Sequence, residues 1–358
     1  MKIAILSFYS GIENRGVETL VQELSKRLAK NHKVFVFQAG PNNKKQSKYK
    51  TIELRSPFRP GHSEGILRKL YLDFYSLTIF QFTLRCLPYF LREKFDIILP
   101  LNNGWQSILC KLYCLFSSSR LVFSGQSGLG WDDRLNLYLN PDVFIALTEK
   151  NKNWAQSINS KAKIVKISNG VDLKNFNPRT TPKQINLKKP LVISIAALIP
   201  SKRLELAIQA VFSLSNVSLL LLGEGHLKNK LQKLGLKLLG KKRFKIISCA
   251  HQQVPPYLKC AQVFTLPSIP QESFGIAIVE ALASNLPVVV TDDSSRREIV
   301  GNAGFFVDPK NITQYKDKLQ KAINYHWGEI PRNQAKKFSW DKITQNYEQL
   351  FLRLISKK

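Results

Sequence analysis

A strand, a loop, an apolar helix and a second strand follow one another between Phe264 and Asp292. Both strands are short apolar runs, as expected for strands buried in a parallel sheet, and a Leu-Pro pair ends the helix between them. A loop that joins the carboxyl end of such a strand to a helix directs free backbone N–H groups and the positive end of the helix dipole to one place. The stretch therefore predicts an α/β domain with an anion-binding site in this loop.

Two carboxylates flank the predicted helix. Glu272 comes just before it and Glu280 lies two turns inside it. Eight helical residues advance about 12 Å along the axis and about 80° around it, so the two carboxylates could bind opposite ends of one elongated ligand. Two glutamates at this spacing are by themselves more often solvated surface residues, and only the surrounding strand, loop and helix make the pattern specific.

The pattern E-x7-E, with Phe274 and Gly275 after the first glutamate, resembles the donor-site motif of glycosyltransferase family 4. That family consists of retaining enzymes with the GT-B fold. The resemblance implies an α/β protein with two doubly wound, Rossmann-like domains that face each other across a cleft. A nucleotide sugar would bind mainly to the second domain, and the acceptor mainly to the first.

Three further motifs extend the resemblance over nearly the whole chain. The run Ser-Asn-Gly-Val-Asp at 168–172, followed by Phe176, is similar to the family's junction between domains. Gly223 and Gly225 match the family's G-x-G turn. Gly16 opens an amphipathic helix after the first strand, as in the family's first loop.

Three positions depart from the family's pattern. Arg15 stands where the first loop usually has a glycine, and Ala197 stands where an arginine is common. Gln126 stands where a histidine near the transferred sugar is common. A glutamine amide can hydrogen-bond to sugar hydroxyls but cannot act as a base near neutral pH.

The resemblance also assigns roles to residues. Glu280 would hold the ribose hydroxyls, Lys202 the diphosphate, and Glu272 the hydroxyls of the transferred sugar. Lys202 and Arg203 are predicted to open a helix, where cations oppose the dipole by a few tenths to about 1 kcal/mol unless an anion binds there. We expect the catalytic residues to be Glu272 and Lys202, the other donor-binding residues to be Gly16, Arg203, Gly223, Phe274, Gly275, Ile276 and Glu280, and the acceptor-side residues to be Asn103 and Gln126.

Proline and polar residues between 178 and 190 are typical of a linker. We therefore expect an acceptor-side domain over residues 1–177, a nucleotide-sugar-binding domain over 191–336, and a helix over 337–358 that packs back on the first domain.

No metal ion and no cofactor are expected besides the nucleotide-sugar co-substrate, a UDP- or GDP-sugar. The pair Asp132-Asp133 resembles half of a metal-binding D-x-D motif, but acidic residues at a helix start are common caps, and that is the interpretation taken here. The family retains anomeric configuration. The absence of an obvious nucleophile from the motifs fits a front-face reaction in which the leaving phosphate acts as the base.

The chain carries 54 Lys and Arg against 25 Asp and Glu, a formal net charge of +29. Such an excess fits nucleic acid, an anionic membrane surface or anionic substrates such as nucleotide sugars. No nucleic-acid-binding motif supports the first partner. Residues 65–94 are basic, aromatic and amphipathic, so they could lie on an anionic membrane surface. The favoured interpretation for most of these residues is a helix pair packed on the sheet, and both can hold together with the basic edge facing lipid.

The five cysteines have no disulfide or metal spacing, which favours reduced thiols in a cytoplasmic protein. The first apolar run is too short for a signal peptide, and no run of about 20 apolar residues predicts a spanning helix. The expected location is the cytoplasm, with peripheral binding to the inner face of the plasma membrane. The expected partners are a nucleotide sugar and a glycan, lipid-linked or other envelope acceptor.

Two other functions share the predicted fold. A sugar-nucleotide 2-epimerase would need acid–base carboxylates and histidines in the cleft, and few are found in the right turns. A non-catalytic protein that binds nucleotide sugars or glycans would tolerate the departures at positions 15, 126 and 197. Release of nucleoside diphosphate only when an acceptor is present distinguishes a transferase from both.

Overall fold

The computed structural model describes residues 1–13, 16–41, 48–57 and 65–356. The chain divides into two compact units, of which one joins Met1–Asn169 to the segment that begins at Trp340, and the other is Gly170–Ser339. Arg15, one of the departures from the family pattern, lies outside the described residues.

The first unit ends at Asn169 and resumes at Trp340. The sequence predicted instead that the first domain ends at residue 177, before a linker, and that the last helix begins at residue 337. Two contacts explain why the segment after Asn169 belongs with the second unit. Arg332 donates hydrogen bonds to the carbonyl oxygens of Leu173 and Phe176, at 2.8 Å and 2.5 Å. Val171 forms an isolated parallel bridge with Ser339.

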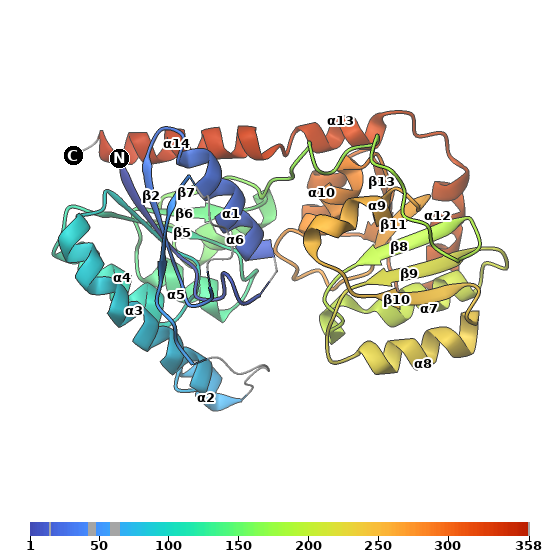
Figure 1. Ribbon diagram of the computed structural model, residues 1–358, viewed down its shortest axis with the longest axis horizontal. Coiled ribbons are helices and arrows are strands. Elements are labelled where there is room, and N and C mark those ends of the chain that lie inside the picture. Colours follow the sequence, from blue (N-terminus) through green and yellow to red (C-terminus); the bar gives the residue numbers. More distant parts are fainter. Residues whose placement is uncertain (14–15, 42–47, 58–64, 357–358) are drawn as a thin grey trace. The chain divides into compact units, whose positions relative to one another are not determined.

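The first unit is built on a parallel sheet whose seven described strands have the order β3-β2-β1-β4-β5-β6-β7 (Figure 1). Along β1, Ile3 and Ile5 join the core on one face, and Ala4 and Leu6 join the core on the other. Because helices cover both faces of such a sheet, its central strands are almost entirely apolar. The strands are β1 (Lys2–Leu6), β2 (Lys33–Gln38), β3 (Lys50–Glu53), β4 (Ile97–Pro100), β5 (Arg120–Ser124), β6 (Val143–Ala146) and β7 (Ile164–Lys166).

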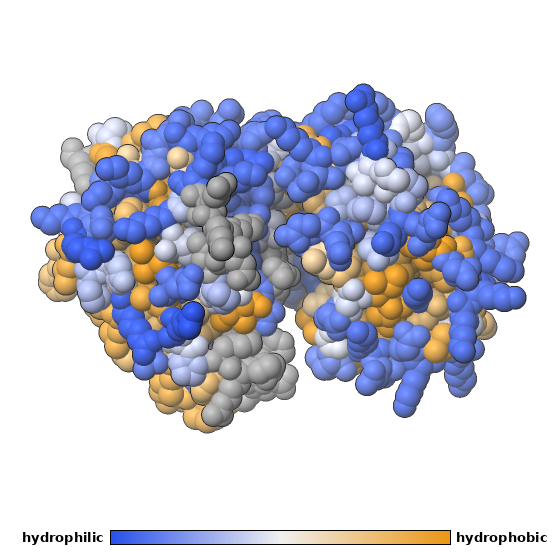
Figure 2. All heavy atoms as spheres, in the orientation of Figure 1, coloured by the Kyte–Doolittle hydropathy of each residue, from blue (hydrophilic) through white to orange (hydrophobic). Residues whose placement is uncertain are grey.

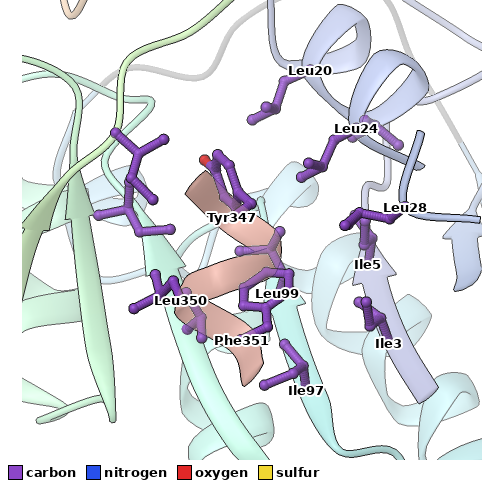
Figure 3. Packing of buried hydrophobic residues seen from close by; sticks show 14 of the residues in the cluster. Ile3, Ile5, Leu20, Leu24, Leu28, Ile97, Leu99, Tyr347, Leu350 and Phe351 are labelled. Atoms are coloured by element: carbon purple, nitrogen blue, oxygen red, sulfur yellow. The ribbon is translucent and has the colours of Figure 1, made fainter. Parts of the chain in front are cut away.

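One face of this sheet is covered by two helices that are far apart in the sequence. Figure 3 shows Leu20, Leu24 and Leu28 from one of them together with Tyr347 and Phe351 from the other, packed over the strands. Helix α3 packs on the opposite face. The helices of this unit are α1 (Gly16–Leu28), α2 (Ile66–Lys69), α3 (Phe74–Glu93), α4 (Trp105–Leu115), α5 (Trp131–Tyr138), α6 (Glu149–Ile158) and α14 (Trp340–Ile355).

The second unit has a parallel sheet of six described strands in the order β10-β9-β8-β11-β12-β13. The strands are β8 (Leu191–Ile195), β9 (Ser218–Leu222), β10 (Phe244–Ile247), β11 (Val263–Leu266), β12 (Val288–Thr291) and β13 (Gly304–Val307). The helices are α7 (Leu204–Phe212), α8 (Lys228–Leu239), α9 (Val254–Leu258), α10 (Ile276–Ala283), α11 (Ser294–Val300), α12 (Ile312–Asn324) and α13 (Ile330–Lys336).

Each sheet reverses its strand order once, between β1 and β4 in the first unit and between β8 and β11 in the second. At such a switch point the loops after the two central strands diverge, and ligands of open α/β sheets bind at the carboxyl ends of the strands there. The two doubly wound parallel sheets confirm the predicted fold class. They also place Lys202, Arg203 and Glu272 on the two loops that diverge.

Candidate active site

The loops after β8 and β11 meet through an ion pair. Nζ of Lys202 lies 2.5 Å from Oε1 of Glu272, and both side chains are largely buried, with 20% and 14% exposed. Burial by itself raises the pKa of Glu272, but the ammonium of Lys202 and the guanidinium of Arg296 outweigh it, so this pKa lies below its ordinary value. The two predicted catalytic residues are therefore in direct contact, and the carboxylate is ionised at neutral pH.

Arg296 is a member of this site that the sequence did not indicate. It lies in α11, after β12, and only 3% of its side chain is exposed. Its Nη2 donates to Oγ of Ser268 at 2.6 Å and lies 3.4 Å from Oε2 of Glu272. Nη1 is paired with Asp293, the residue that caps α11. Among the described residues none accepts a hydrogen bond from Nε of Arg296.

Arg203 joins the loop after β8 to the loop after β11 by hydrogen bonds. Its Nε donates to the carbonyl oxygen of Pro267 and its Nη2 to that of Ser268, each at 2.8 Å. Nη2 also lies 3.3 Å from the hydroxyl of Thr291 at the end of β12. The N–H groups of Arg203 are therefore directed at the loop after β11. A contact between Arg203 and a nucleotide sugar remains a prediction.

The helix that Lys202 and Arg203 were predicted to open does not begin there. Pro200–Lys202 form a single 3-10 turn, and α7 starts at Leu204. Between them Arg203 adopts a left-handed conformation with φ of 48°. Its guanidinium reaches the carbonyl groups of the neighbouring loop from this position, and those bonds offset the cost of the unusual backbone conformation.

Helix α10 begins one residue after Gly275, which has φ of 84° and caps the helix through its backbone. A side chain on Gly275 would be strained at this φ, and its Cβ would approach Cδ1 of Ile278 to 3.0 Å. Phe274 is buried against Phe338, with 5.8 Å between ring centroids. The first-turn N–H groups from Ile276 onward thus follow Glu272 by a few residues, and N–H groups at a helix start bind anions.

Glu280 is one turn inside α10, not two as predicted, because the helix starts only at Ile276. Its side chain is buried, and its Oε1 lies 2.6 Å from Nε2 of His251. The His251 ring also packs against Phe176, with 5.5 Å between ring centroids. Sequence reasoning found no role for His251, since it lies 29 residues from Glu280 and no local pattern links the two.

The G-x-G turn after β9 supports the loop that carries Lys202. Gly223 and Gly225 have φ of 155° and 154°. A Cβ on Gly223 would lie 1.9 Å from the carbonyl oxygen of Ala196, and one on Gly225 would lie 2.4 Å from that of Leu198. The turn therefore needs glycine because its backbone lies directly against the loop after β8.

In the first unit, Asn103 and Gln126 lie at the carboxyl ends of β4 and β5. Nδ2 of Asn103 donates to Oγ of Ser127 at 2.6 Å, so that the loops after the two strands are joined. Gln126 exchanges two amide hydrogen bonds with Asn169, at 3.2 Å and 3.0 Å. The structure brings the two predicted acceptor-side residues to one edge of the sheet. Gly16 lies at the start of α1.

The interpretation of Asp132 and Asp133 as helix caps is wrong. Gly130 is the N-cap of α5. Asp132 instead accepts from Nη2 of Arg68 at 3.0 Å and from the hydroxyl of Tyr71 at 2.7 Å. Asp133 is buried and accepts from backbone N–H groups of the loop that follows β5; burial, with repulsion from Asp132, raises its pKa well above the ordinary value. Within the described residues, no group of three or more His, Cys, Asp or Glu side chains could hold a metal ion.

These features define a class of protein. One chain with two doubly wound α/β units has the GT-B fold of glycosyltransferases. The family model of glycosyl transferases group 1 matches residues 176–338, and that of glycosyltransferase family 4 matches residues 14–175. The chain belongs to the group 1 glycosyltransferases of family 4.

Solved structures of the same fold match nearly the whole chain. Sucrose-phosphate synthase from Thermosynechococcus elongatus gives a TM-score of 0.83 at 18% identity and covers 100% of both chains. HepE from Anabaena, in complex with UDP and glucose, gives 0.78 at 17% identity and covers 99% of this chain and 100% of that chain.

Among curated proteins, sulfoquinovosyl transferase SQD2 of Arabidopsis thaliana is 26% identical over 192 residues, which is 49% of this chain and 37% of SQD2. The chain spans 24% to 47% of the length of the first three curated relatives that it matches.

The buried pair of Arg296 and Asp293 can be tested by unfolding. Arg296→Leu should lower the free energy of unfolding by about 3–5 kcal/mol, because it leaves the largely buried Asp293 without its partner. The double variant Arg296→Leu/Asp293→Asn should lose much less, since it removes both charges and keeps a side chain that can cap α11. Urea titration followed by circular dichroism measures both.

The neighbouring residue provides the control. Arg297 forms a similar pair with Asp292, but 60% of its side chain is exposed. Arg297→Leu should leave the free energy of unfolding nearly unchanged, because an exposed ion pair contributes little to stability. Equal losses for Arg296→Leu and Arg297→Leu would contradict a buried ion cluster at this site.

Proposed function

We propose that the chain is a glycosyltransferase that moves a hexose from a nucleotide sugar to a glycan, lipid-linked or other envelope acceptor, with retention of configuration and without a metal ion. The observation that carries the proposal is the cluster of Lys202, Glu272 and Arg296 at the switch point of the second sheet. Lys202 and the first N–H groups of α10 come from the two loops that diverge there. A lysine and a helix N-terminus on neighbouring loops are suited to an anionic ligand.

The parts of the donor would contact three sets of groups. The ribose hydroxyls would bind Glu280, whose carboxylate is held by His251. The diphosphate would bind Lys202 and the first N–H groups of α10, after Gly275. HepE, which binds UDP and UDP-glucose, supports a uridine nucleotide as one candidate donor.

Cleavage of the bond between the sugar and the diphosphate moves an electron pair, and with it negative charge, to the leaving phosphate. Lys202 and the N-terminus of α10 would stabilise this charge, as cations or metal ions do in other transferases. Lys202 is bound to Glu272 in the structure, so the diphosphate would replace the carboxylate as the partner of Lys202. Arg296 would then keep Glu272 in place.

Glu272 would accept hydrogen bonds from hydroxyls of the transferred sugar. Because its pKa is lowered, it is ionised at neutral pH and cannot act as a general acid there. In the front-face reaction that we favour, the oxygen of the acceptor hydroxyl bonds to the anomeric carbon on the side from which the phosphate leaves. The leaving phosphate takes the proton of that hydroxyl, so no protein nucleophile is needed.

The acceptor would bind to the first unit near Asn103 and Gln126, at the carboxyl ends of β4 and β5. The NH₂ group of Gln126 donates to Ser124 and Asn169, so donating to a sugar would replace one of these bonds, whereas its carbonyl oxygen can accept from a sugar hydroxyl in addition to Asn169. We place the reaction in the cytoplasm, since all five cysteines are free thiols, which suits a reducing compartment.

The proposal is tested with a panel of nucleotide sugars. The matching UDP- or GDP-sugar should raise the melting temperature, because a ligand at 100 times its Kd adds about 2.7 kcal/mol of stability. The same compound should release nucleoside diphosphate only when a glycan or lipid-linked acceptor is added. Binding without release in a broad acceptor panel would indicate a binding protein, and isomerisation of the sugar nucleotide an epimerase. No binding by any compound would refute the proposal.

Lys202→Ala should reduce kcat by about 10²–10³-fold at saturating donor, since the leaving diphosphate loses a stabilising charge. Arg296 still holds Glu272 in this variant, so the fold of the loop should remain. Lys237→Ala on the exposed face of α8 is the matched control and should retain wild-type turnover. Near-full activity of Lys202→Ala would show that Lys202 is only a partner of Glu272.

Transfer should continue in the presence of EDTA, because cations of the protein take the role of a metal beside the diphosphate. The measurement is the initial rate before and after chelation, with Mg²⁺ or Mn²⁺ added back. Loss of activity that either ion restores would contradict metal independence and would direct attention to Asp132, Asp133, Asp292 and Asp293.

A further inference from the structure

Helix α3 is apolar on two opposite sides. Its inner side packs on the first sheet through residues such as Phe82 and Phe90. Six of the eight exposed residues of α3 are spaced three or four apart from Phe74 to Leu91 and form one stripe along the helix; the other two are Arg85 and Arg92. Five of these six are apolar, Gln81 being the exception. A helix that only covers a sheet would carry polar residues at these positions.

The stripe continues onto the two neighbouring helices. Eleven of the 17 large hydrophobic residues that are exposed in the described part of the chain lie between Ile66 and Phe116. We call this surface the α2–α4 face; its most exposed members are Ile66, Leu67, Leu70, Leu91, Leu115 and Phe116.

The three helices lie together. In α3 and α4, Phe80 is 5.3 Å from Trp105 and Phe90 is 5.1 Å from Tyr113, measured between ring centroids. Just after α2, the backbone carbonyl of Tyr71 accepts a hydrogen bond from the Trp105 ring. Figure 2 shows hydrophobic residues in orange along the lower left edge of the first unit, where Figure 1 places α2, α3 and α4.

The charged residues of the α2–α4 face are basic. Lys69, Arg85, Arg92 and Lys94 are exposed on α2, on α3 and just after α3. Of the three acidic side chains in residues 65–116, only Glu93 pairs with one of these basic residues. Glu93 lies 3.5 Å from Arg92 and also pairs with Lys2 at 3.3 Å, whereas Asp73 caps α3 and is buried, and Asp96 accepts from the backbone N–H of Lys2 at 2.7 Å. An apolar surface with a positive margin results.

We propose that the α2–α4 face binds the surface of an anionic lipid bilayer, with its leucines among the acyl chains and its basic residues at the phosphate groups. This mode needs only an amphipathic surface. No described helix is long and apolar enough to cross a membrane. A second copy of this chain is a poorer occupant, because each copy has a formal charge of +29 and two basic margins would meet. The proposal rests on the first unit alone and does not depend on the proposed transferase activity.

Co-sedimentation with vesicles tests it. The full chain should bind vesicles that contain phosphatidylglycerol, bind phosphatidylcholine vesicles much less, and dissociate as salt is raised, because screening weakens the phosphate contacts. Leu84→Gln/Leu91→Gln should weaken binding at least about tenfold, since two exposed leucines no longer enter the bilayer. Lys69→Gln/Arg92→Gln should weaken it about fivefold for each cation removed.

Matched variants elsewhere separate this face from the general positive charge. Phe212→Gln/Leu352→Gln removes two exposed apolar residues outside the face, and Lys233→Gln/Lys237→Gln removes two exposed lysines of α8. Both should bind like the unchanged chain. Far-UV circular dichroism checks that each variant is folded, and the single variant Phe116→Ser, at a position 91% exposed, repeats the test with little risk to the core.

Three results would overturn the proposal. The first is recovery of the unchanged chain in the supernatant with anionic vesicles at low salt. The second is equal weakening by the control variants, which would assign binding to diffuse charge. The third is a dimer in sedimentation velocity that Leu84→Gln/Leu91→Gln dissociates while vesicle binding stays unchanged, which would make a second copy the occupant.

Discussion

One buried carboxylate connects three loops of the second unit. Glu272 lies after β11, its partner Lys202 after β8, and Arg296 after β12. These three strands are neighbours in the sheet, so the pairs join the carboxyl ends of adjacent strands. An isolated buried carboxylate would cost several kcal/mol of desolvation, and the two cations together offset that cost. The positions of these three loops therefore depend on the ion pairs of Glu272 as well as on the strands that the loops follow.

The sheet supplies the positions at which such a cluster can form. In a doubly wound sheet the loops diverge only at the switch point, and β8 and β11 are the strands on either side of it. Close backbone contacts hold the loop after β8 there, because the turn at Gly223 and Gly225 leaves no room for side chains. The close backbone packing of the loop after β8 and the ion pair with Glu272 together fix the position of Lys202.

The fold was predictable from the sequence because its signals are local. Short apolar runs, glycines at turns and amphipathic helices follow from burial and backbone geometry within a few residues, and they predicted two parallel α/β sheets correctly. The loop around Glu272 was predictable for the same reason, since a strand, a loop and a helix follow one another there.

Contacts between distant segments were not predictable. The pairing of Arg296 with Glu272 joins residues 24 positions apart, and that of Asp132 with Tyr71 joins residues 61 apart. Local rules assigned Asp132 to a helix cap because they take account only of the residues beside it. The left-handed conformation of Arg203 was missed because its cause, the carbonyl groups of residues 267 and 268, lies on another loop.

The place of α14 in the first unit has a consequence for how the protein is made. The core on one face of the first sheet contains Tyr347 and Phe351, so it stays incomplete until these residues have been synthesised. The second unit is continuous from Gly170 to Ser339 and can close its own core earlier. At about 5–20 residues per second, the ribosome needs on the order of 10–40 s to pass from Asn169 to the end of α14. During that interval the apolar side chains of α1 and β1 lack their last partner, which makes the nascent first unit a natural client of chaperones that hold exposed apolar surface.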